Sequence, residues 1–180
     1  MKSVFIAFAA IIGIALFSLC CVMSSQNGAI GLEETVKSAQ SAIDVQLTNR
    51  FNKFHELAEC VKKYDEHEYK SLCDVIAQRG KNMSGKDAKQ CIAAFSRVEE
   101  RYPDLKSHTN YKHLMNEISI TENHLSQIKI AYNNSVKDYN YHCRKFPTSM
   151  FLSLVGYQPQ HFNMYAADES VKDNKPITMF

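Results

Sequence analysis

The chain has 180 residues, of which 45% are hydrophobic and 22% are charged, with only 6 Gly, 4 Pro and no Trp. This length fits one folded domain, and the scarcity of turn-forming residues favours long helices over many short strands. The net charge is +2 and the basic residues are dispersed among acidic ones. The composition therefore excludes a nucleic-acid-binding face, which needs clustered Lys and Arg.

The N-terminus carries an uncharged apolar run, SVFIAFAAIIGIALFSLCCVM, at residues 3–23. An apolar run of about 20 residues is long enough to span a bilayer as a helix. A cleaved signal peptide is the alternative interpretation. The run is longer than a usual signal core and lacks a good small-x-small cleavage site, so we expect an uncleaved membrane anchor over residues 1–25.

Charges beside this run predict its orientation. Lys2 is the basic residue in front of it, and Glu33, Glu34 and Lys37 follow it with no positive excess. The positive-inside rule therefore predicts a single-pass protein with a cytoplasmic N-terminus and an extracytoplasmic C-terminal domain. Disulfides become possible in that compartment. The chain has 6 cysteines, whose spacings fit no zinc pattern.

The next residues predict two helices. SSQNG at 24–28 predicts a short polar exit from the membrane, and a helical pattern starts near Ala29. Its apolar residues recur at spacings of three and four, which mark one face of a helix: Val36, Ala39, Ile43, Leu47, Phe51, Phe54, Ala58 and Val61. Asp65 with Glu68 predicts the capped start of a second helix, which ends at Gly80. GKNMSG at 80–85 predicts a turn.

Two further helices follow. The third has an apolar face and ends where Pro103 interrupts the pattern; this face comprises Ala88, Cys91, Ile92, Phe95, Val98 and Tyr102. The fourth extends from about Ser107 to Phe146, and Pro147 stops it. Amphipathic helices must bury their apolar faces against one another. The predicted fold is therefore all-α, with an N-terminal transmembrane helix followed by an antiparallel four-helix bundle over residues 26–147.

Several segments have a recognisable order and spacing. They are IDVQLTNRF (43–51), VEERYPDLKSHTNYKHL (98–114), EISITENHL (117–125), AYNNSVKDYN (131–140), and KFP followed by GYQP (145–159). With these segments the chain resembles the LemA family from about residue 30 to its end. The resemblance implies a membrane anchor followed by a helical bundle outside the cytoplasm, and it implies no established enzymatic activity. One departure is FNKFHELAE at 51–59, which lacks the Pro-Asn step that family members usually carry.

The polar residues shared with this family are candidate site residues. They lie on the first and fourth helices and are predicted to meet across the antiparallel pair: Asp44, Gln46, Arg50, Glu122, Asn123, Tyr132 and Asn133. One interpretation is a hydrogen-bond network that fixes the helix register, because buried polar groups need partners. The other is a groove that binds a partner protein. We favour the network.

Two short stretches resemble metal-binding or catalytic motifs. HELAE at 55–59 begins like a zinc-protease motif, but Glu59 stands where the second His would be. His142 and Cys143 are adjacent, yet Cys143 continues the apolar stripe while His142 lies about 100° round the helix. We therefore favour packing over a reactive pair. Nucleophile motifs are missing, and no acidic residue stands three positions before any His. We expect no enzyme, no metal and no cofactor.

Three predictions concern cysteines and the C-terminal region. Cys73 and Cys91 are nearly level in the predicted hairpin, which predicts either a disulfide or two buried thiols. Residues 148–180 begin with an apolar patch, which either lies at the bilayer interface or covers the open end of the bundle. The patch comprises Phe151, Leu152, Leu154, Val155 and Tyr157. Residues 166–180 are polar, and we expect them to be mobile.

The sequence therefore predicts a membrane-anchored, non-enzymatic scaffold, adaptor or accessory subunit of the cell envelope. Its expected partners are the lipid bilayer and other envelope proteins or further copies of itself, and not nucleic acid. One alternative is an envelope enzyme or sensor with a site around Asp44, Arg50, Glu122 and Tyr132. A third class is a membrane-remodelling protein that acts through residues 148–165.

Overall fold

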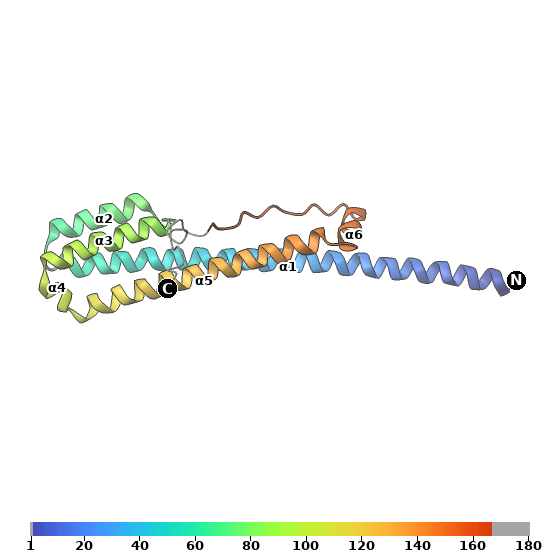
Figure 1. Ribbon diagram of the computed structural model, residues 1–180, viewed down its shortest axis with the longest axis horizontal. Helices are drawn as coiled ribbons and strands as arrows, with labels where there is room; N and C mark the ends of the chain where they lie inside the picture. The colour runs from blue at the N-terminus through green and yellow to red at the C-terminus, as the bar shows by residue number, and fades with distance from the viewer. Residues whose placement is uncertain (1, 167–180) are drawn as a thin grey trace, which may run out of the picture. The chain divides into compact units, whose positions relative to one another are not determined.

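The computed structural model describes residues 2–166, which form six helices and no strand (Figure 1). The helices are α1 (Lys2–Lys62), α2 (Glu66–Arg79), α3 (Gly85–Arg101), α4 (Pro103–Ser107), α5 (Thr109–Arg144) and α6 (Thr148–Leu154). The predicted all-α class is confirmed for this part of the chain. The predicted mobile tail lies outside the described residues from position 167 on.

The chain divides into two compact units. Unit 1 comprises residues 1–40 and 131–164, and unit 2 comprises residues 41–130 and 165–180. Both α1 and α5 contribute residues to each unit. In this division the apolar run belongs to the same unit as the end of α5. The domain boundaries at residues 25 and 147 stay predictions.

Helix α1 passes through residues 24–28 without a break, so the helix start predicted near Ala29 is wrong. The polar side chains are accommodated inside the helix: the Ser25 hydroxyl donates to the Cys21 carbonyl at 2.8 Å. The helix also continues through 51–59, the segment without a proline. Among the described residues, α1 is the one helix long and apolar enough to cross a membrane. Large apolar side chains of its first turns are exposed: Phe5, Ile6, Phe8, Ile11, Ile12, Ile14, Leu16, Phe17 and Leu19.

Unit 2 is built around one hydrophobic core. The rings of Phe54 on α1 and Phe95 on α3 stack with their centroids 6.1 Å apart, and both side chains are fully buried. Leu72 and Ile76 of α2 and Ile118 of α5 belong to the same cluster. Each comes from the apolar stripe of its helix, so burial of these stripes holds the helices of unit 2 together.

Local signals set the ends of the short helices. The Asp65 carboxylate caps α2 by accepting from the backbone N–H groups of His67 and Glu68, at 2.8 and 3.0 Å. Gly80 follows α2 with φ of +65°, a conformation that favours glycine. Sequence reasoning did not find the capping box at the start of α3, in which Ser84 and Asp87 bond each other reciprocally.

Unit 1 pairs the first part of α1 with the last part of α5. Its buried apolar residues include Ala29 and Val36 on α1 and Val136 and Cys143 on α5. The predicted fourth helix from about Ser107 to Phe146 corresponds to α5, and the short helix α4, which was not predicted, ends just before it at Ser107. After a cis peptide bond between Phe146 and Pro147, α6 follows.

Candidate functional site

A buried arginine forms the most polar centre of unit 2. The Arg50 guanidinium is fully buried, and its Nη1 donates to both carboxylate oxygens of Glu122 on α5, at 3.0 and 3.3 Å. Its Nη2 donates to the carbonyl of Met83, in the turn between α2 and α3. Arg50 Nε has no hydrogen-bond partner among the described residues. A single side chain on α1 therefore ties two other parts of unit 2 together.

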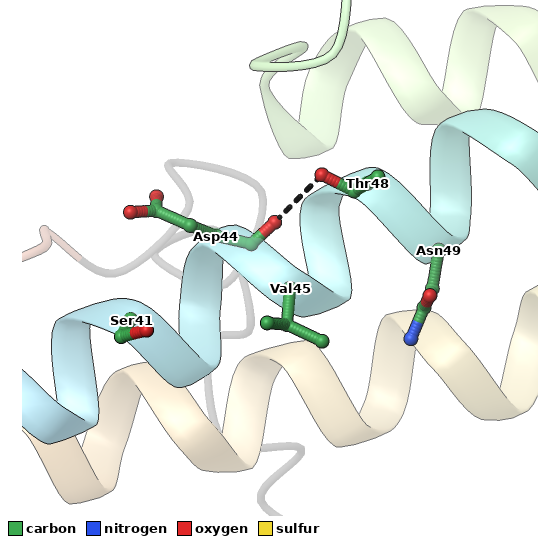
Figure 2. Close-up of a pocket in the computed structure, with 5 residues that line it drawn as sticks. All are labelled: Ser41, Asp44, Val45, Thr48 and Asn49. Atoms are coloured by element: carbon green, nitrogen blue, oxygen red, sulfur yellow. Dashed lines mark hydrogen bonds between the residues drawn. The ribbon is translucent and has the colours of Figure 1, made fainter.

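The other residues predicted to join this network lie in different surroundings. Asp44 and Asn123 are exposed and Gln46 is half-buried. Asp44 is one of the residues that line an open hollow of about 280 Å³. Its backbone carbonyl accepts from the Thr48 hydroxyl, at a distance of 3.0 Å (Figure 2). All the lining residues come from α1: Ser41, Asp44, Val45, Thr48 and Asn49. A hollow lined by one helix offers no convergent groups for catalysis.

Tyr132 and Asn133 belong to unit 1, whereas Arg50 and Glu122 belong to unit 2. The Tyr132 side chain is buried, and its hydroxyl donates to the carbonyl of Asn163 at 3.1 Å. Asn133 is half-buried. Of the seven candidate residues, the structure thus places Arg50 and Glu122 in direct contact with each other.

Unit 1 has a polar centre of its own, which sequence reasoning missed. The Tyr157 hydroxyl donates to Glu33 at 2.9 Å, and it lies 3.1 Å from the Tyr139 hydroxyl. Because Tyr157 gives its one hydroxyl proton to a carboxylate, Tyr139 must donate to Tyr157. The Tyr139 oxygen in turn accepts from the backbone N–H of Gln160 at 2.9 Å. We call this chain of hydrogen bonds the tyrosine relay.

The relay fastens residues 155–164, the C-terminal strap, to both long helices. Glu33 lies on α1, Tyr139 on α5, and Tyr157 and Gln160 on the strap. The ring of Phe162 meets the Tyr139 ring edge-on at 5.4 Å between centroids. The quoted GYQP segment supplies one of these groups, Tyr157, but nothing in its local spacing identifies Glu33, 124 residues away, as the partner.

Electrostatics keep the relay in one protonation state near neutral pH. Hydrogen bonds from Lys37 and then Tyr157 lower the pKa of the Glu33 carboxyl. Burial raises the pKa of Tyr139, and burial together with hydrogen bonds to Tyr139 and Glu33 raises the pKa of Tyr157. Near neutral pH both phenols therefore stay protonated and the Glu33 carboxylate stays charged.

His142 and Cys143 do not form a reactive pair. His142 Nε2 lies 3.0 Å from the Ser25 carbonyl oxygen, and its imidazole sits directly over Gly28. A Cβ built on Gly28 would be 2.8 Å from His142 Cε1, so only glycine leaves room for the ring. Cys143 is buried, and burial raises the pKa of its thiol. A reactive thiol needs the opposite setting.

Comparison with known proteins adds one assignment. The sequence model of the LemA family matches residues 39–180. The chain belongs to the LemA family. Comparison with curated proteins gives no significant match. The matched region contains Arg50 and Glu122 of the first polar centre and Tyr139 and Tyr157 of the second. Glu33 lies before the matched region of this LemA-family chain.

The remaining candidates of the LemA-family chain lie on α1, α2 and α3. His55 meets the Phe51 ring edge-on at 4.7 Å, and Glu59 accepts from the Tyr69 hydroxyl at 2.7 Å. Each therefore has an apolar or hydrogen-bonding neighbour of its own. Cys91 is buried and Cys73 is half-buried, and both are free thiols. Their disulfide stays a prediction, which non-reducing peptide mapping tests.

The predicted apolar patch divides into two faces. Leu152 is buried, Phe151 is half-buried, and Tyr157 is half-buried in the relay. Leu154 and Val155 are exposed. Phe146 and Met150 are exposed as well. Met150 and Leu154 lie four residues apart on one face of α6.

Proposed function

We propose that this LemA-family chain is a single-pass membrane protein whose extracytoplasmic helical domain acts as a scaffold or adaptor for other envelope proteins or for further copies of itself. The observation that carries the proposal is the first part of α1, where none of the apolar window is buried inside the protein. An apolar surface of this length is stable in a bilayer and unstable in water. Lys2 in front of the run supports a cytoplasmic N-terminus.

The proposed domain fold is an antiparallel four-helix bundle. Support comes from two ion pairs between α1 and α5: Arg50 with Glu122 at 3.0 Å, and Lys53 with Glu117 at 2.6 Å. From one pair to the next, the residue number rises on α1 and falls on α5. Two helices that run in opposite directions give this order.

A binding role accounts better for the polar centres than catalysis does. Arg50 is paired with Glu122, and Glu33 is paired with Lys37 and Tyr157. These charged groups are committed to contacts within the chain, whereas a catalytic group must reach its substrate. Unit 2 also exposes three large apolar side chains that a partner protein would bury: Val45, Ile120 and Ile130.

Membrane extraction tests the anchor. We expect the full-length chain to remain in the membrane pellet after alkaline carbonate treatment, and Ile11→Arg with Ile14→Arg to release it, because charges in the bilayer centre are costly. A matched control is Ile120→Arg with Ile130→Arg, which leaves the apolar run intact. A soluble wild-type chain would contradict the anchor.

A reporter fused to the C-terminus tests the orientation of the chain in the membrane. A reporter signal from the cytoplasm would contradict the proposed topology.

Site-specific photo-crosslinking tests the scaffold role. A photoreactive amino acid at Val45 or at Ile120 is expected to give discrete cross-linked products in intact membranes. The same amino acid at Lys112, an exposed polar position on the helix that carries Ile120, is the matched control. No cross-link at Val45 or Ile120 under any growth condition would argue against a scaffold.

A further inference from the structure

The outer side of α6 carries large apolar side chains that nothing in the described chain covers. Thr148 and Leu152, four residues apart, are buried and hold α6 against unit 1. On the opposite side, and just before and after the helix, lie four exposed apolar residues, which we call the α6 face: Phe146 (81% exposed), Met150 (48%), Leu154 (72%) and Val155 (43%). An isolated exposed apolar residue is ordinary, but four within residues 146–155 indicate an interaction surface.

The position of the α6 face along α1 is set by contacts within unit 1. The His142–Ser25 contact and the close approach at Gly28 fix the end of α5 beside residues 25–28. Ser25 is two residues beyond Met23, the last residue of the apolar run, so it lies about 3 Å outside the hydrocarbon layer if that run spans the bilayer. The end of α5 is therefore at the level of the lipid headgroups.

α6 lies nearer still to the apolar run. Figure 1 shows it beyond the end of α5, on the side toward the N-terminus of α1. Cys21 and Val22, in the last turn of the apolar run, are partly covered, whereas residues 8–20 are all exposed. Other parts of unit 1 thus reach back to the last turn of the run, and α6 lies on the same side of the end of α5 as that run.

The charge of the same region suits a lipid surface. Arg144 and Lys145 are exposed, and residues 139–166 contain no Asp or Glu. Lys145 Nζ lies 5.5 Å from the centroid of the exposed Tyr141 ring. Tyrosines with basic side chains are typical of the membrane–water interface, where the basic groups meet anionic headgroups.

From this arrangement we propose that the α6 face is a second membrane contact, which lies in the headgroup layer of the bilayer that α1 crosses, with Arg144 and Lys145 on anionic headgroups. This inference rests on the membrane anchoring proposed above. A second copy of the chain is the competing occupant of the face, but two copies would bring like charges together at Arg144 and Lys145.

Single tryptophans test the proposal, because the chain has no Trp of its own. Phe146→Trp and Leu154→Trp are made separately in the full-length chain, which is reconstituted into vesicles of phosphatidylcholine and phosphatidylglycerol in equal amounts. Quenching by lipids brominated near the headgroup or deep in the acyl chain reports the depth of each tryptophan. We expect both to be quenched about tenfold more strongly by the shallow bromines than Ile120→Trp, an exposed apolar position in unit 2 that serves as the matched control.

A tryptophan in the apolar run separates failure of this inference from failure of the anchor. Phe8→Trp should be quenched by the deep bromines. If it is quenched and both α6-face tryptophans are not, the anchor stands and the second contact is wrong. If Phe8→Trp is not quenched, the anchor fails and the second contact falls with it. Shielded emission at Phe146→Trp without lipid quenching, lost when the protein is diluted in lipid, would identify a second copy as the occupant and overturn the proposal.

A lipid-charge comparison tests the part played by Arg144 and Lys145. In vesicles of phosphatidylcholine alone, shallow quenching at Phe146→Trp is expected to fall several-fold. Arg144→Gln with Lys145→Gln should give the same loss in mixed vesicles and no further loss in neutral ones. Equal quenching in both kinds of vesicle would show that anionic headgroups do not contribute to the membrane contact of the α6 face.

Discussion

Unit 1 and unit 2 use parts of the same two long helices but hold them together by different means. In unit 2, aromatic and aliphatic side chains from α1, α2, α3 and α5 form one buried cluster, and Arg50 is the charged residue inside it. In unit 1 the helices meet through small residues, such as Ala29 and Gly28, and through the tyrosine relay. Substitutions that shrink buried side chains should therefore destabilise unit 2. Unit 1 should be destabilised by larger side chains between its helices and by the loss of hydrogen bonds.

The largest expected effect comes from removing an aromatic ring from the core of unit 2. Phe95→Ala should lower the free energy of unfolding by about 3–5 kcal/mol, because it removes buried area and leaves a cavity beside Phe54. Hydrogen exchange of backbone amides, read separately for each unit in detergent, measures this loss. Phe146→Ala, at an exposed ring, is the control. A loss confined to unit 1 would contradict the assignment of the core.

The ion pair of Arg50 gives the next effect. Glu122→Ala leaves a fully buried guanidinium with the Met83 carbonyl as its main acceptor, which should cost about 2–4 kcal/mol, less than a fully enclosed pair because Glu122 is 26% exposed. Glu122→Gln keeps a hydrogen-bond acceptor and should cost less. Thermal unfolding followed by circular dichroism measures both. Equal stability of Glu122→Ala and the wild type would show that Arg50 does not depend on its partner.

Gly28 tests whether close approach, rather than apolar volume, holds unit 1. Gly28→Ala should destabilise unit 1 by about 1–2 kcal/mol, because the new methyl group meets the His142 ring. In a His142→Ala background, Gly28→Ala should instead stabilise unit 1 by about 0.5–1 kcal/mol, because Ala is favoured over Gly in a helix by this amount.

Gly31 provides the matched control for this reversal. A Cβ at Gly31 meets nothing within 4 Å, so Gly31→Ala should stabilise α1 in both backgrounds. Hydrogen exchange of residues 139–146 reports the release of the end of α5. If Gly28→Ala behaves like Gly31→Ala beside the wild-type histidine, the close contact is not present in solution.

The smallest expected effect concerns the tyrosine relay and its pH dependence. Tyr157→Phe removes a donor to Glu33 and an acceptor for Tyr139, which should cost about 1 kcal/mol, whereas Tyr141→Phe at an exposed ring should cost almost nothing. Because the folded state lowers the pKa of Glu33, its contribution is present above the ordinary carboxyl pKa and is lost as pH falls through the lowered one. Tyr157→Phe should weaken this acid sensitivity, which pH titration of the exchange rates of unit 1 would detect.

Local and repeating signals made much of the fold predictable. The cap at Asp65, the glycine at Gly80 and the stripes around Phe54 and Phe95 act over one or two helical turns, which is the range that sequence spacing reports. The helix start predicted near Ala29 was wrong because a polar stretch is compatible with a helix when its hydroxyls bond back to the preceding turn, as Ser25 does.

The site was predictable only in part. Arg50 and Glu122 were found because they lie on two long helices whose pairing the sequence suggests. Tyr132 was assigned to the same network, but its hydroxyl bonds the strap at Asn163. Glu33 and Tyr157 were not paired in advance, since the strap must fold back along α5 before they meet, and neither helical nor strand periodicity encodes that return.

The continuity of α1 also sets its rotational register. Buried positions on this helix recur every seven residues, at Ala29, Val36, Ile43, Arg50 and Leu57, and one step earlier stands the partly covered Val22. Because no joint separates residues 3–23 from residues 24–40, the two stretches turn about the helix axis together. One extra residue at position 24 would rotate the apolar run by about 100° against the side chain of His142. The rotational orientation of the apolar run about the helix axis is thus set by the same helix that packs in unit 1.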